Sequence, residues 1–436
     1  MPQLSPIQFT VLMTPFEAYL QCKAVSTDTR NIVPGSVFFA LKGARFNGNE
    51  YALQALANGA SYAVVDEPVG EDYRLLKVDD VLTALQDCAK QYRRHLGISI
   101  IGLTGSNGKT TNKELFYAVL STRFKVHATK GNFNNHIGVP LTLLGIPEGT
   151  EMGVVEMGAN HQGEIALLTS ICEPNLGYIT NYGKAHMEGF GGVEGIIKGK
   201  SELYDVIRKH KNAAVLLNTD DPIQIEKSQG CPTITFGQHS GQYQWMSKSE
   251  GEFAGICFEH ENRVHKIKSQ LSGSFNETNV AAAVALGLHY GIAASNIVKA
   301  IESYVPTMNR VEWRETAHNK VLLDAYNANP TSMSLSVESF AKWHPEGILI
   351  LGDMFELGDA AAQEHEAMIK LVRESGMSQR CILVGDFFGR TSWEGAHFGT
   401  AVELATYWNE KGAPKDAHIL LKGSRGIALE QLLPFL

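Results

Sequence analysis

One short stretch constrains the fold of this chain more than any other. It reads Ile100-Ile101-Gly102-Leu103-Thr104-Gly105-Ser106-Asn107-Gly108-Lys109-Thr110-Thr111. An apolar strand passes here through a glycine turn into a helix that we expect to continue to Leu120. Such a turn presents free backbone N–H groups and the positive end of a helix dipole to an anion. The stretch therefore predicts a phosphate-binding loop between a buried strand and a helix.

The residues after the turn indicate which phosphate compound would bind. Lys109 would reach the terminal phosphates of a nucleotide, and the Thr110 hydroxyl would bind Mg²⁺. Position 103 is Leu, so the loop has the shorter Gly-x-x-Gly-Lys-Thr spacing. An ordinary glycine-rich turn is the alternative, but Gly-Lys-Thr-Thr after a buried strand favours nucleoside triphosphate binding. The loop alone leaves the chemistry open.

Composition limits the class of protein. A chain of 436 residues predicts roughly three domains at about 150 residues each. The net charge of −8 argues against nonspecific nucleic-acid binding. Six cysteines without a C-x-x-C pair suit reduced thiols in a cytoplasm. No apolar run approaches 18 residues and no secretion signal is visible, so we expect a cytoplasmic protein without a membrane span.

Residues 1–97 are expected to form a small α/β domain. Its predicted strands are 37–41 and 62–65, and its predicted helices are 51–58 and 81–96. Two polar clusters, 26–30 and 42–49, are by composition alone more typical of turns and helix caps than of a binding site.

Residues 98–310 are expected to form a central domain in which buried strands alternate with helices. This pattern predicts a parallel sheet whose ligands gather at the carboxyl ends of its strands. Glu156 ends the strand 152–155, and His186 lies in the loop after the strand 176–180. A helix over 193–208 and a strand over 213–217 follow. Short alternating stretches within 231–270 predict antiparallel hairpins attached to this domain.

Residues 306–310 mark a second boundary, beyond which 311–436 restart as βαβα. Predicted strands are 321–323, 348–351, 381–384 and 419–421, and predicted helices are 331–342, 361–375 and 401–411. The pattern indicates a Rossmann-like domain, but no Gly-x-Gly-x-x-Gly follows its first strand. A nicotinamide cofactor is therefore not supported.

Four side chains bear on a metal site. Glu156, at the end of a buried strand, is the best candidate to bind the Mg²⁺ of a triphosphate. A lone histidine such as His186 is more often structural than a ligand. Lys198 and Lys200 on the next helix are by default solvent-facing charges. Spacing alone would not place a lysine at a Mg²⁺ site, because an ammonium group repels the ion.

The sequence resembles the Mur ligases of peptidoglycan synthesis over all three expected domains. The matching stretches are 26–30, 38–43, 103–111, 131–140, 156–164, 273–279, 324–330, 352–358 and 422–425. Tyr326-Asn327-Ala328-Asn329-Pro330 and Gly158-Ala159-Asn160-His161-Gln162-Gly163-Glu164 resemble the member of the family that adds a dipeptide. The resemblance implies an α/β fold of three domains: a small N-terminal UDP-substrate domain, a central P-loop domain with an antiparallel extension, and a C-terminal Rossmann-like domain.

The family resemblance also implies a reaction. ATP phosphorylates the terminal carboxylate of UDP-N-acetylmuramoyl-tripeptide, and the amine of D-Ala-D-Ala then displaces phosphate from the acyl phosphate. Cations at the site offset the repulsion between the carboxylate and the γ-phosphate. The family uses two Mg²⁺ ions, which implies Thr110 and Glu156 at one ion and His186 at the other. Lys200, 14 residues after His186, matches the family's carbamylated lysine, whose negative charge removes the objection to a lysine at a metal site.

By the same resemblance, Lys109, His186 and Lys200 are expected to be catalytic. The expected ATP-binding residues are Thr104, Gly105, Ser106, Asn107, Gly108, Lys109, Thr110, Thr111, Asn276, Asn279, Arg310 and Asp324. The expected substrate-binding residues are Ser26, Asp28, Arg30, Lys42, Asn134, Asn135, Tyr326, Asn327, Asn329, Lys422, Ser424 and Arg425. Phe275 stands where the family usually has His. We expect a monomer that closes on its substrates about a hinge near Asn309 and Arg310.

Two other functions share the phosphate loop. Folylpolyglutamate synthesis would not call for an N-terminal UDP-binding domain of nearly a hundred residues. A P-loop switch acting on a protein partner would hydrolyse nucleotide without a second substrate. The sequence does not distinguish lysine from diaminopimelate as the third residue of the tripeptide.

Overall fold

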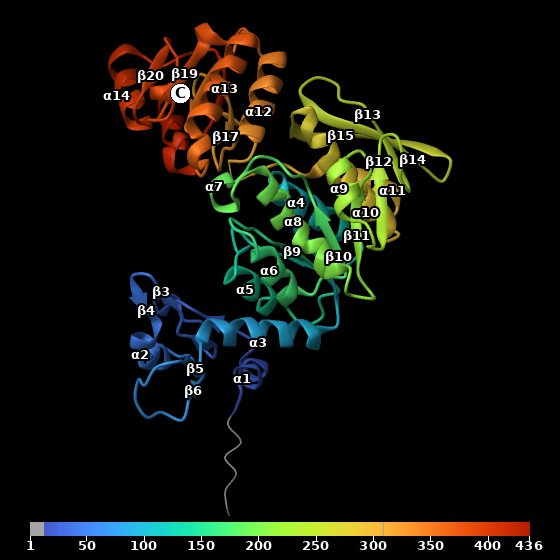
Figure 1. Ribbon diagram of the computed structural model, residues 1–436, viewed down its shortest axis with the longest axis vertical. Helices are drawn as coiled ribbons and strands as arrows, with labels where there is room; N and C mark the ends of the chain where they lie inside the picture. Colours follow the sequence, from blue (N-terminus) through green and yellow to red (C-terminus); the bar gives the residue numbers. More distant parts are fainter. Residues whose placement is uncertain (1–12, 308) are drawn as a thin grey trace, which may run out of the picture.

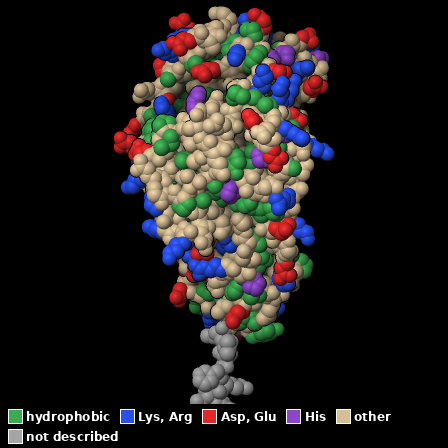
Figure 2. All heavy atoms as spheres, turned by 90° about the vertical axis from the view of Figure 1, so that its right-hand side faces the viewer, with side chains coloured by type: hydrophobic (Ala, Val, Ile, Leu, Met, Phe, Trp, Pro, Cys, Tyr) green, Lys and Arg blue, Asp and Glu red, His purple; other side chains and the backbone are tan. Residues whose placement is uncertain are grey.

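The computed structural model describes residues 13–307 and 309–436. The first twelve residues of the expected N-terminal domain, and Met308 of the expected second boundary, lie outside the described residues. Three open sheets follow one another along the long axis of the molecule (Figure 1), with the N-terminal sheet at the bottom and the C-terminal sheet at the top. Acidic and basic side chains are interspersed on the face shown in Figure 2. The predicted three-domain α/β class is confirmed.

The N-terminal sheet has four parallel strands in the order β1-β2-β5-β6, and β3 and β4 form a separate hairpin. The elements are α1 (Pro15–Cys22), β1 (Val25–Ser26), β2 (Val37–Phe39), β3 (Lys42–Gly43), β4 (Phe46–Asn47), α2 (Ala52–Ala57), β5 (Tyr62–Val65), β6 (Leu75–Lys77) and α3 (Val81–Leu96). The Asp80 side chain caps α3 at the Thr83 N–H, and Gly97 ends it in a left-handed conformation. The predicted helix 81–96 is thus confirmed at both ends.

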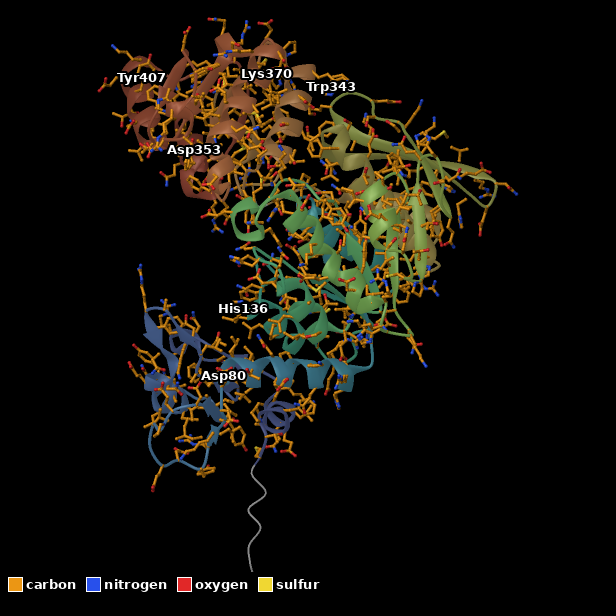
Figure 3. The ribbon with its side chains drawn as sticks, in the orientation of Figure 1. Asp80, His136, Trp343, Asp353, Lys370 and Tyr407 are labelled. Atoms are coloured by element: carbon orange, nitrogen blue, oxygen red, sulfur yellow. The ribbon has the colours of Figure 1, made fainter. Side chains whose placement is uncertain are left out.

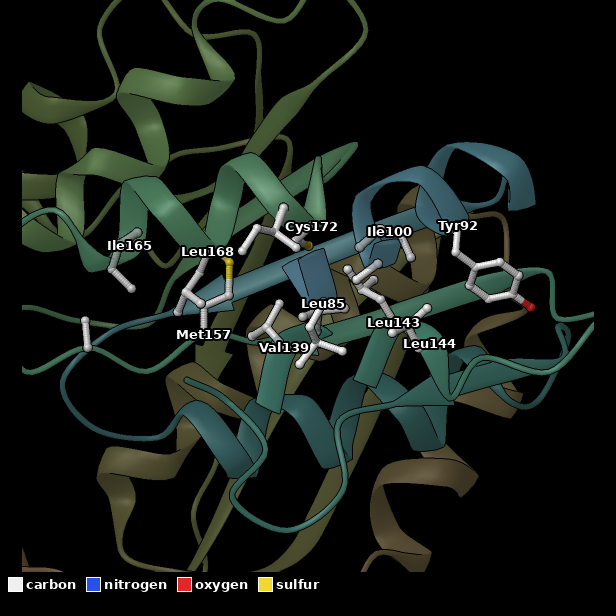
Figure 4. Packing of buried hydrophobic residues seen from close by; sticks show 14 of the residues in the cluster. Leu85, Tyr92, Ile100, Val139, Leu143, Leu144, Met157, Ile165, Leu168 and Cys172 are labelled. Atoms are coloured by element: carbon white, nitrogen blue, oxygen red, sulfur yellow. The ribbon is translucent and has the colours of Figure 1, made fainter. Parts of the chain in front are cut away.

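Helix α3 joins the N-terminal sheet to the central domain. Its buried residues Val81, Leu85, Ala89 and Tyr92 recur at helical spacing. They belong to one apolar cluster that also holds Val139 and other residues of the central domain (Figure 4). Burying each such side chain contributes roughly 1.5–3 kcal/mol. The first two domains therefore share a continuous core.

The central sheet has nine strands in the order β15-β14-β13-β12-β11-β10-β7-β9-β8. Its strands are β7 (Ser99–Thr104), β8 (Val126–Ala128), β9 (Met152–Glu156), β10 (Leu176–Ile179), β11 (Ala214–Asn218), β12 (Thr233–Gly237), β13 (Tyr243–Ser247), β14 (Phe253–His260) and β15 (Arg263–Ser272). Its helices are α4 (Lys109–Leu120), α5 (Gly138–Leu144), α6 (Glu164–Cys172), α7 (Met187–Phe190), α8 (Val193–Ile207), α9 (Pro222–Lys227), α10 (Glu277–His289) and α11 (Ala294–Ser303). Strands β7, β9, β10 and β11 are parallel, so their carboxyl ends lie at one edge of the sheet.

The prediction of antiparallel hairpins throughout 231–270 is wrong in its first part. β12 pairs in parallel with β11, and β13 pairs in parallel with the last two residues of β12. Only β13–β14 and β14–β15 are antiparallel. The buried side chains of Ile234 and Phe236 extend the central core, which places β12 inside the large sheet. Alternation of apolar and polar residues reports one buried face but not the direction of the neighbouring strand.

The C-terminal sheet has six strands in the order β16-β17-β21-β18-β19-β20, all parallel except the edge strand β16. Its strands are β16 (Glu312–Glu315), β17 (Lys320–Asp324), β18 (Ile348–Gly352), β19 (Cys381–Val384), β20 (Ala396–Phe398) and β21 (His418–Lys422). Its helices are α12 (Pro330–Trp343), α13 (Ala361–Glu374) and α14 (Ala401–Lys411). Figure 3 shows Trp343 at the end of α12, beside the central domain's antiparallel strands. None of the helices in the described parts of the chain has the length and apolar character needed to cross a bilayer.

Candidate active site at the strand ends

The phosphate loop is shaped by two glycines and braced by the neighbouring strand. Gly105 has φ 140°, and a Cβ there would lie 1.9 Å from Thr180 Oγ1, so no larger residue fits. The Ser106 N–H donates to Asn181 O at 3.0 Å, and the Thr180 hydroxyl donates to Asn107 O at 2.6 Å. Gly108 (φ 77°) then turns the chain into α4. The first N–H groups of α4, which have no partner within the helix, point toward this loop.

Lys109 folds back over the loop. Its Nζ donates to the carbonyls of Gly105 at 2.7 Å and Ser106 at 3.1 Å. Burial lowers the pKa of Lys109 to about 8. A half-buried ammonium whose hydrogen bonds go only to neutral carbonyls gains from an added anion, and a phosphate in the loop supplies that charge.

Thr110 and Glu156 meet at the carboxyl end of β9. The Thr110 hydroxyl donates to Glu156 Oε2 at 3.0 Å, and the Asn134 amide donates to Oε1 at 2.9 Å. The Glu156 N–H donates to the Thr129 hydroxyl at 3.0 Å, which fixes the backbone of this residue. Glu156 is only 2% exposed, and both hydrogen-bond donors to its carboxylate are neutral. A buried carboxylate beside a hydroxyl is a donor set that fits a hard cation such as Mg²⁺.

Lys200 lies inside the protein. It is fully buried, its Nζ donates to Ala159 O at 3.2 Å, and the same Nζ lies 4.8 Å from the centroid of the Phe190 ring. Burial lowers the pKa of Lys200 well below its usual value. Lys198 is exposed, so the default expectation of two solvent-facing lysines is wrong for Lys200 alone. The reason is that Lys200 faces the core side of α8, where a neutral amine is favoured.

His186 and Glu356 come together from different domains. His186 Nδ1 lies 2.5 Å from Glu356 Oε2, and both side chains line the same cavity as Glu156. The His186 contact lowers the pKa of Glu356. Within residues 13–307 and 309–436 no group of three or more His, Cys, Asp or Glu side chains converges as a metal site. A metal here would need the mixed ligand set of hydroxyl, carboxylate, imidazole and modified lysine that the sequence predicts.

A cavity of about 870 Å³ lies between the phosphate loop, Glu156 and His186 on one side and the C-terminal domain on the other. The predicted site residues that line it are Ser106, Asn107, Gly108, Lys109, Thr110, Thr111, Asn134, Asn135, Glu156, His186, Asn276, Asn279, Arg310, Asp324, Tyr326, Asn327, Asn329 and Lys422. The predicted site residues outside its lining are Ser26, Asp28, Arg30, Lys42, Thr104, Gly105, Lys200, Ser424 and Arg425. Residues of the central and C-terminal domains, such as Ser106 and Tyr326, thus surround one cavity although they are more than 200 positions apart in the sequence.

A chain of buried amides supports the far side of the loop. The Asn279 amide donates to Asn276 Oδ1 at 2.8 Å, and the Asn112 amide donates to Asn279 Oδ1 at 2.7 Å and to Gly108 O at 2.9 Å. Asn112 was not predicted as a site residue, because it reads as an ordinary residue of α4. Phe275, which lines the cavity, presents an apolar ring there.

The C-terminal domain contributes charged and aromatic groups to the cavity. The guanidinium of Arg310 lies 3.7 Å from the centroid of the Tyr326 ring. Lys422 Nζ lies 2.8 Å from Asp324 Oδ2 and donates to Asn327 O at 2.9 Å. Arg425 lies farther off, 5.6 Å from the same ring. Arg310 lies in the linker before β16, whereas the other residues come from the carboxyl ends of β17 and β21, which face the central domain.

The predicted substrate residues of the N-terminal domain contact other residues of that domain. Ser26 Oγ lies 2.9 Å from Ser36 Oγ, and Asp28 caps the turn that holds Arg30, with which it forms an ion pair. Lys42 pairs with Asp66 at 2.9 Å. No binding role is visible in these bonds, so a role for these residues stays a prediction. In the central domain, Asn135 Oδ1 likewise accepts the N–H groups of Ile137 at 3.1 Å and Gly138 at 2.8 Å.

Five residues that join the domains were missed. Lys184 Nζ lies 2.5 Å from Glu364 Oε1, and the Lys184 N–H donates to the Thr331 hydroxyl at 3.0 Å. The Glu188 N–H donates to Glu356 O at 3.1 Å. Lys184 and Glu364 read as surface charges, and a pairing between separate domains has no local signal. Glu356 lies in a matching stretch of the resemblance, which was the available signal.

Comparison with known proteins gives a consistent result along the whole chain. Family models described as "Mur ligase family, catalytic domain", "Mur ligase middle domain" and "Mur ligase, glutamate ligase domain" match residues 21–93, 103–287 and 309–425. The UDP-N-acetylmuramoyl-tripeptide–D-alanyl-D-alanine ligase of Bacillus subtilis (strain 168) is 36% identical, with 94% of this chain and 92% of the relative covered. A crystal structure of MurF from Acinetobacter baumannii superposes with a TM-score of 0.84 at 31% identity, covering 94% of this chain and 92% of that one. MurF from Thermotoga maritima in complex with ADP superposes with a TM-score of 0.84 at 25% identity, covering 97% and 98%.

Proposed function

The chain belongs to the Mur ligase family, and from that premise we propose that it is the ATP-dependent ligase that joins D-alanyl-D-alanine to UDP-N-acetylmuramoyl-tripeptide in peptidoglycan synthesis. The product would be UDP-N-acetylmuramoyl-pentapeptide. One observation carries the proposal beyond the similarity. The phosphate loop, the Thr110–Glu156 pair and Lys422 of the C-terminal domain all line one cavity. A domain that only hydrolysed a nucleotide would not need residues of a second domain to line its cavity.

The proposed reaction has two steps. An oxygen of the tripeptide carboxylate attacks the γ-phosphorus of ATP, which forms an acyl phosphate and releases ADP. The dipeptide nitrogen then attacks the acyl carbon, which forms the peptide bond and releases phosphate, and the amine loses a proton. Lys109 would hold the phosphates of ATP from the loop, and Asn276 and Asn279 would lie at the adenine end. The similarity to the Thermotoga maritima MurF in complex with ADP supports nucleotide binding by this chain.

We propose that Mg²⁺ occupies the group around Thr110 and Glu156, and a second Mg²⁺ the group around His186 and Lys200. When bound, these ions offset the negative charges of the carboxylate and the phosphates. The buried Glu156 carboxylate supports the first site. The low pKa and full burial of Lys200 support its carbamylation, because the neutral amine is the form that attacks CO₂. Carbamylation would give a negative group where an ammonium is unfavourable.

We assign each remaining part of the substrates to one of the three domains. We propose residues 1–97 as the domain for the UDP end, with Ser26, Asp28, Arg30 and Lys42 at its loops. Asn134 and Asn135 would lie along the muramoyl-peptide path in the central domain, 98–310. Tyr326, Asn327, Asn329 and the loop of Lys422, Ser424 and Arg425 would receive the dipeptide in the domain 311–436. We further propose a cytoplasmic monomer.

Domain closure is proposed about the linker near Arg310. Asn309 and Val311 both have positive φ, at 57° and 53°. For a β-branched valine this is a rare conformation, so the linker is held by its surroundings rather than by its own preference. Arg310 lies between these two residues and reaches Tyr326, and would therefore close onto ATP together with Asp324.

The direct test is release of phosphate by the purified chain. We expect phosphate only when ATP, Mg²⁺, UDP-N-acetylmuramoyl-tripeptide and D-Ala-D-Ala are all present, in step with formation of the pentapeptide. Parallel assays with the tripeptide that ends in lysine and the one that ends in diaminopimelate would identify the third residue of the substrate. Phosphate release that ignores the dipeptide would overturn the proposal and indicate a nucleotide switch.

A further inference from the structure

Glu356 and His186 reach their contact inside the cavity from different domains. Glu356 follows β18 in the C-terminal domain, and His186 precedes α7 in the central domain. The two side chains meet at 2.5 Å, between Oε2 and Nδ1. Two atoms that both carry lone pairs repel at this distance unless a hydrogen lies between them. A hydrogen on Nδ1 of a neutral His186 beside an ionised Glu356 would relieve this repulsion, and Nε2 would then keep the lone pair that a metal ion uses.

Both backbones adopt a disfavoured conformation at this contact. His186 has φ 55° and Glu356 has φ 61°, although neither is glycine. Such a conformation costs of order 1–3 kcal/mol and persists where the surroundings enforce it. In this conformation Glu356 also accepts the Glu188 N–H through its own carbonyl, at 3.1 Å. The same residue thus contacts the His186 side chain and the backbone two residues beyond it.

The loop that presents Glu356 is rigidly held inside the C-terminal domain. The Met354 N–H donates to His365 Nε2 at 3.1 Å, and the Phe355 N–H donates to Ser424 Oγ at 3.0 Å. The Asp353 carboxylate accepts the N–H groups of Phe387 and Phe388, each at 2.9 Å. A carboxylate on a loop this well supported can hold an imidazole in one orientation.

We propose that Glu356 is a positioning residue that fixes the tautomer and orientation of His186, so that the cation site at His186 is complete only while the C-terminal domain is docked. The proposal rests on the metal role of His186 proposed above. A carboxylate behind a metal-bound histidine typically affects metal affinity by 10–100-fold. Because Glu356 belongs to the other domain, cation binding and domain docking would strengthen each other by the same factor.

The experiment measures binding of Mn²⁺, as a substitute for Mg²⁺, to the full chain with a nonhydrolysable ATP analogue, by the loss of the free Mn²⁺ resonance signal. We expect Glu356→Gln to weaken the His186-dependent binding about tenfold or more. The Glu356 side chain is half exposed, so the variant should fold. In His186→Ala, the added change Glu356→Gln should have no further effect.

Glu252→Gln is the matched control. Glu252 Oε2 lies 2.9 Å from His344 Nε2, which is a second glutamate–histidine contact between the same two domains but away from the cavity. We expect this variant to bind Mn²⁺ as the unmodified chain does. Equal weakening by both variants would assign the effect to docking in general and overturn the positioning role.

The two proposals fail in different ways. If His186→Ala leaves Mn²⁺ binding unchanged, the metal role of His186 is wrong. If His186→Ala weakens binding and Glu356→Gln does not, the metal role stands and the positioning role of Glu356 is overturned.

Discussion

Asn329, which caps helix α12 in the C-terminal domain, donates a 2.7 Å hydrogen bond to Asn107 Oδ1 in the phosphate loop of the central domain. The loop that would hold ATP is thus bonded directly to the domain that would hold the incoming dipeptide. Asn329 also accepts the Ser332 N–H at 2.9 Å, so its side chain is fixed by the helix that it caps. Nucleotide and amine sites are therefore connected through one pair of amides.

The first prediction concerns that pair. Asn107→Ala removes one partner, and Asn329→Ser removes the other while a hydroxyl keeps the helix cap. We expect each change to weaken docking of the C-terminal domain by roughly 0.5–1.5 kcal/mol, and the double variant to be no worse than either single one. Fluorescence energy transfer between labels on the two domains measures the docked fraction. Additive losses would show that the two residues act separately.

The second prediction concerns Lys109. Lys109→Ala removes the one charge that lies on the loop, and we expect turnover to fall by at least about 10²-fold. The fold should persist, because the lysine is held only by two loop carbonyls. The assay is phosphate release with all substrates, and Lys211→Ala at an exposed position is the control. Substantial activity in Lys109→Ala would mean that the phosphates bind elsewhere.

The third prediction concerns Lys200. Lys200→Met replaces a buried amine by an apolar side chain of similar length, and such a change is often neutral or stabilising. We therefore expect an unfolding temperature equal to or above that of the unmodified chain together with loss of ligase activity. Depleting CO₂ from the unmodified enzyme should also lower activity, and bicarbonate should restore it. Activity independent of bicarbonate would contradict carbamylation.

The fourth prediction concerns pH and His365. This side chain is fully buried, and burial lowers its pKa below the ordinary value near 6.5. The unfolded chain therefore binds more protons, so this contribution to stability is present above pH 6.5 and is lost as pH falls below it. Protonation would also break the bond in which Nε2 accepts the Met354 N–H. The loss can reach about 1.4 kcal/mol for each pH unit over which folded and unfolded states differ by one proton.

The measurement for His365 is the urea unfolding midpoint between pH 7.5 and 5. His365→Gln keeps an acceptor for Met354 but does not titrate, so its midpoint should depend less on pH in this range. An equal dependence in both proteins would assign the acid sensitivity to other groups.

Much of the fold was predictable because local patterns determine it. The helix over 81–96 was found at both ends, since Asp80 and Gly97 are strong signals for the start and the end of a helix. The parallel arrangement of β7, β9 and β10 followed from buried strands alternating with helices. The prediction was wrong for the pairs β11–β12 and β12–β13, which are parallel, because strand direction depends on a neighbour that the local alternation does not specify.

By itself the sequence determined the phosphate loop, the carboxylate at the end of β9, and the membership of a family whose motifs extend over all three domains. These depend on glycine geometry, side-chain chemistry and spacing along one segment. Only the tertiary structure decided that Lys200 is buried, that Asn329 bonds to Asn107, and that Glu356 contacts His186. Each of these relations joins residues far apart in the chain, and the free energy of such a contact depends on how whole domains pack, which no local pattern records.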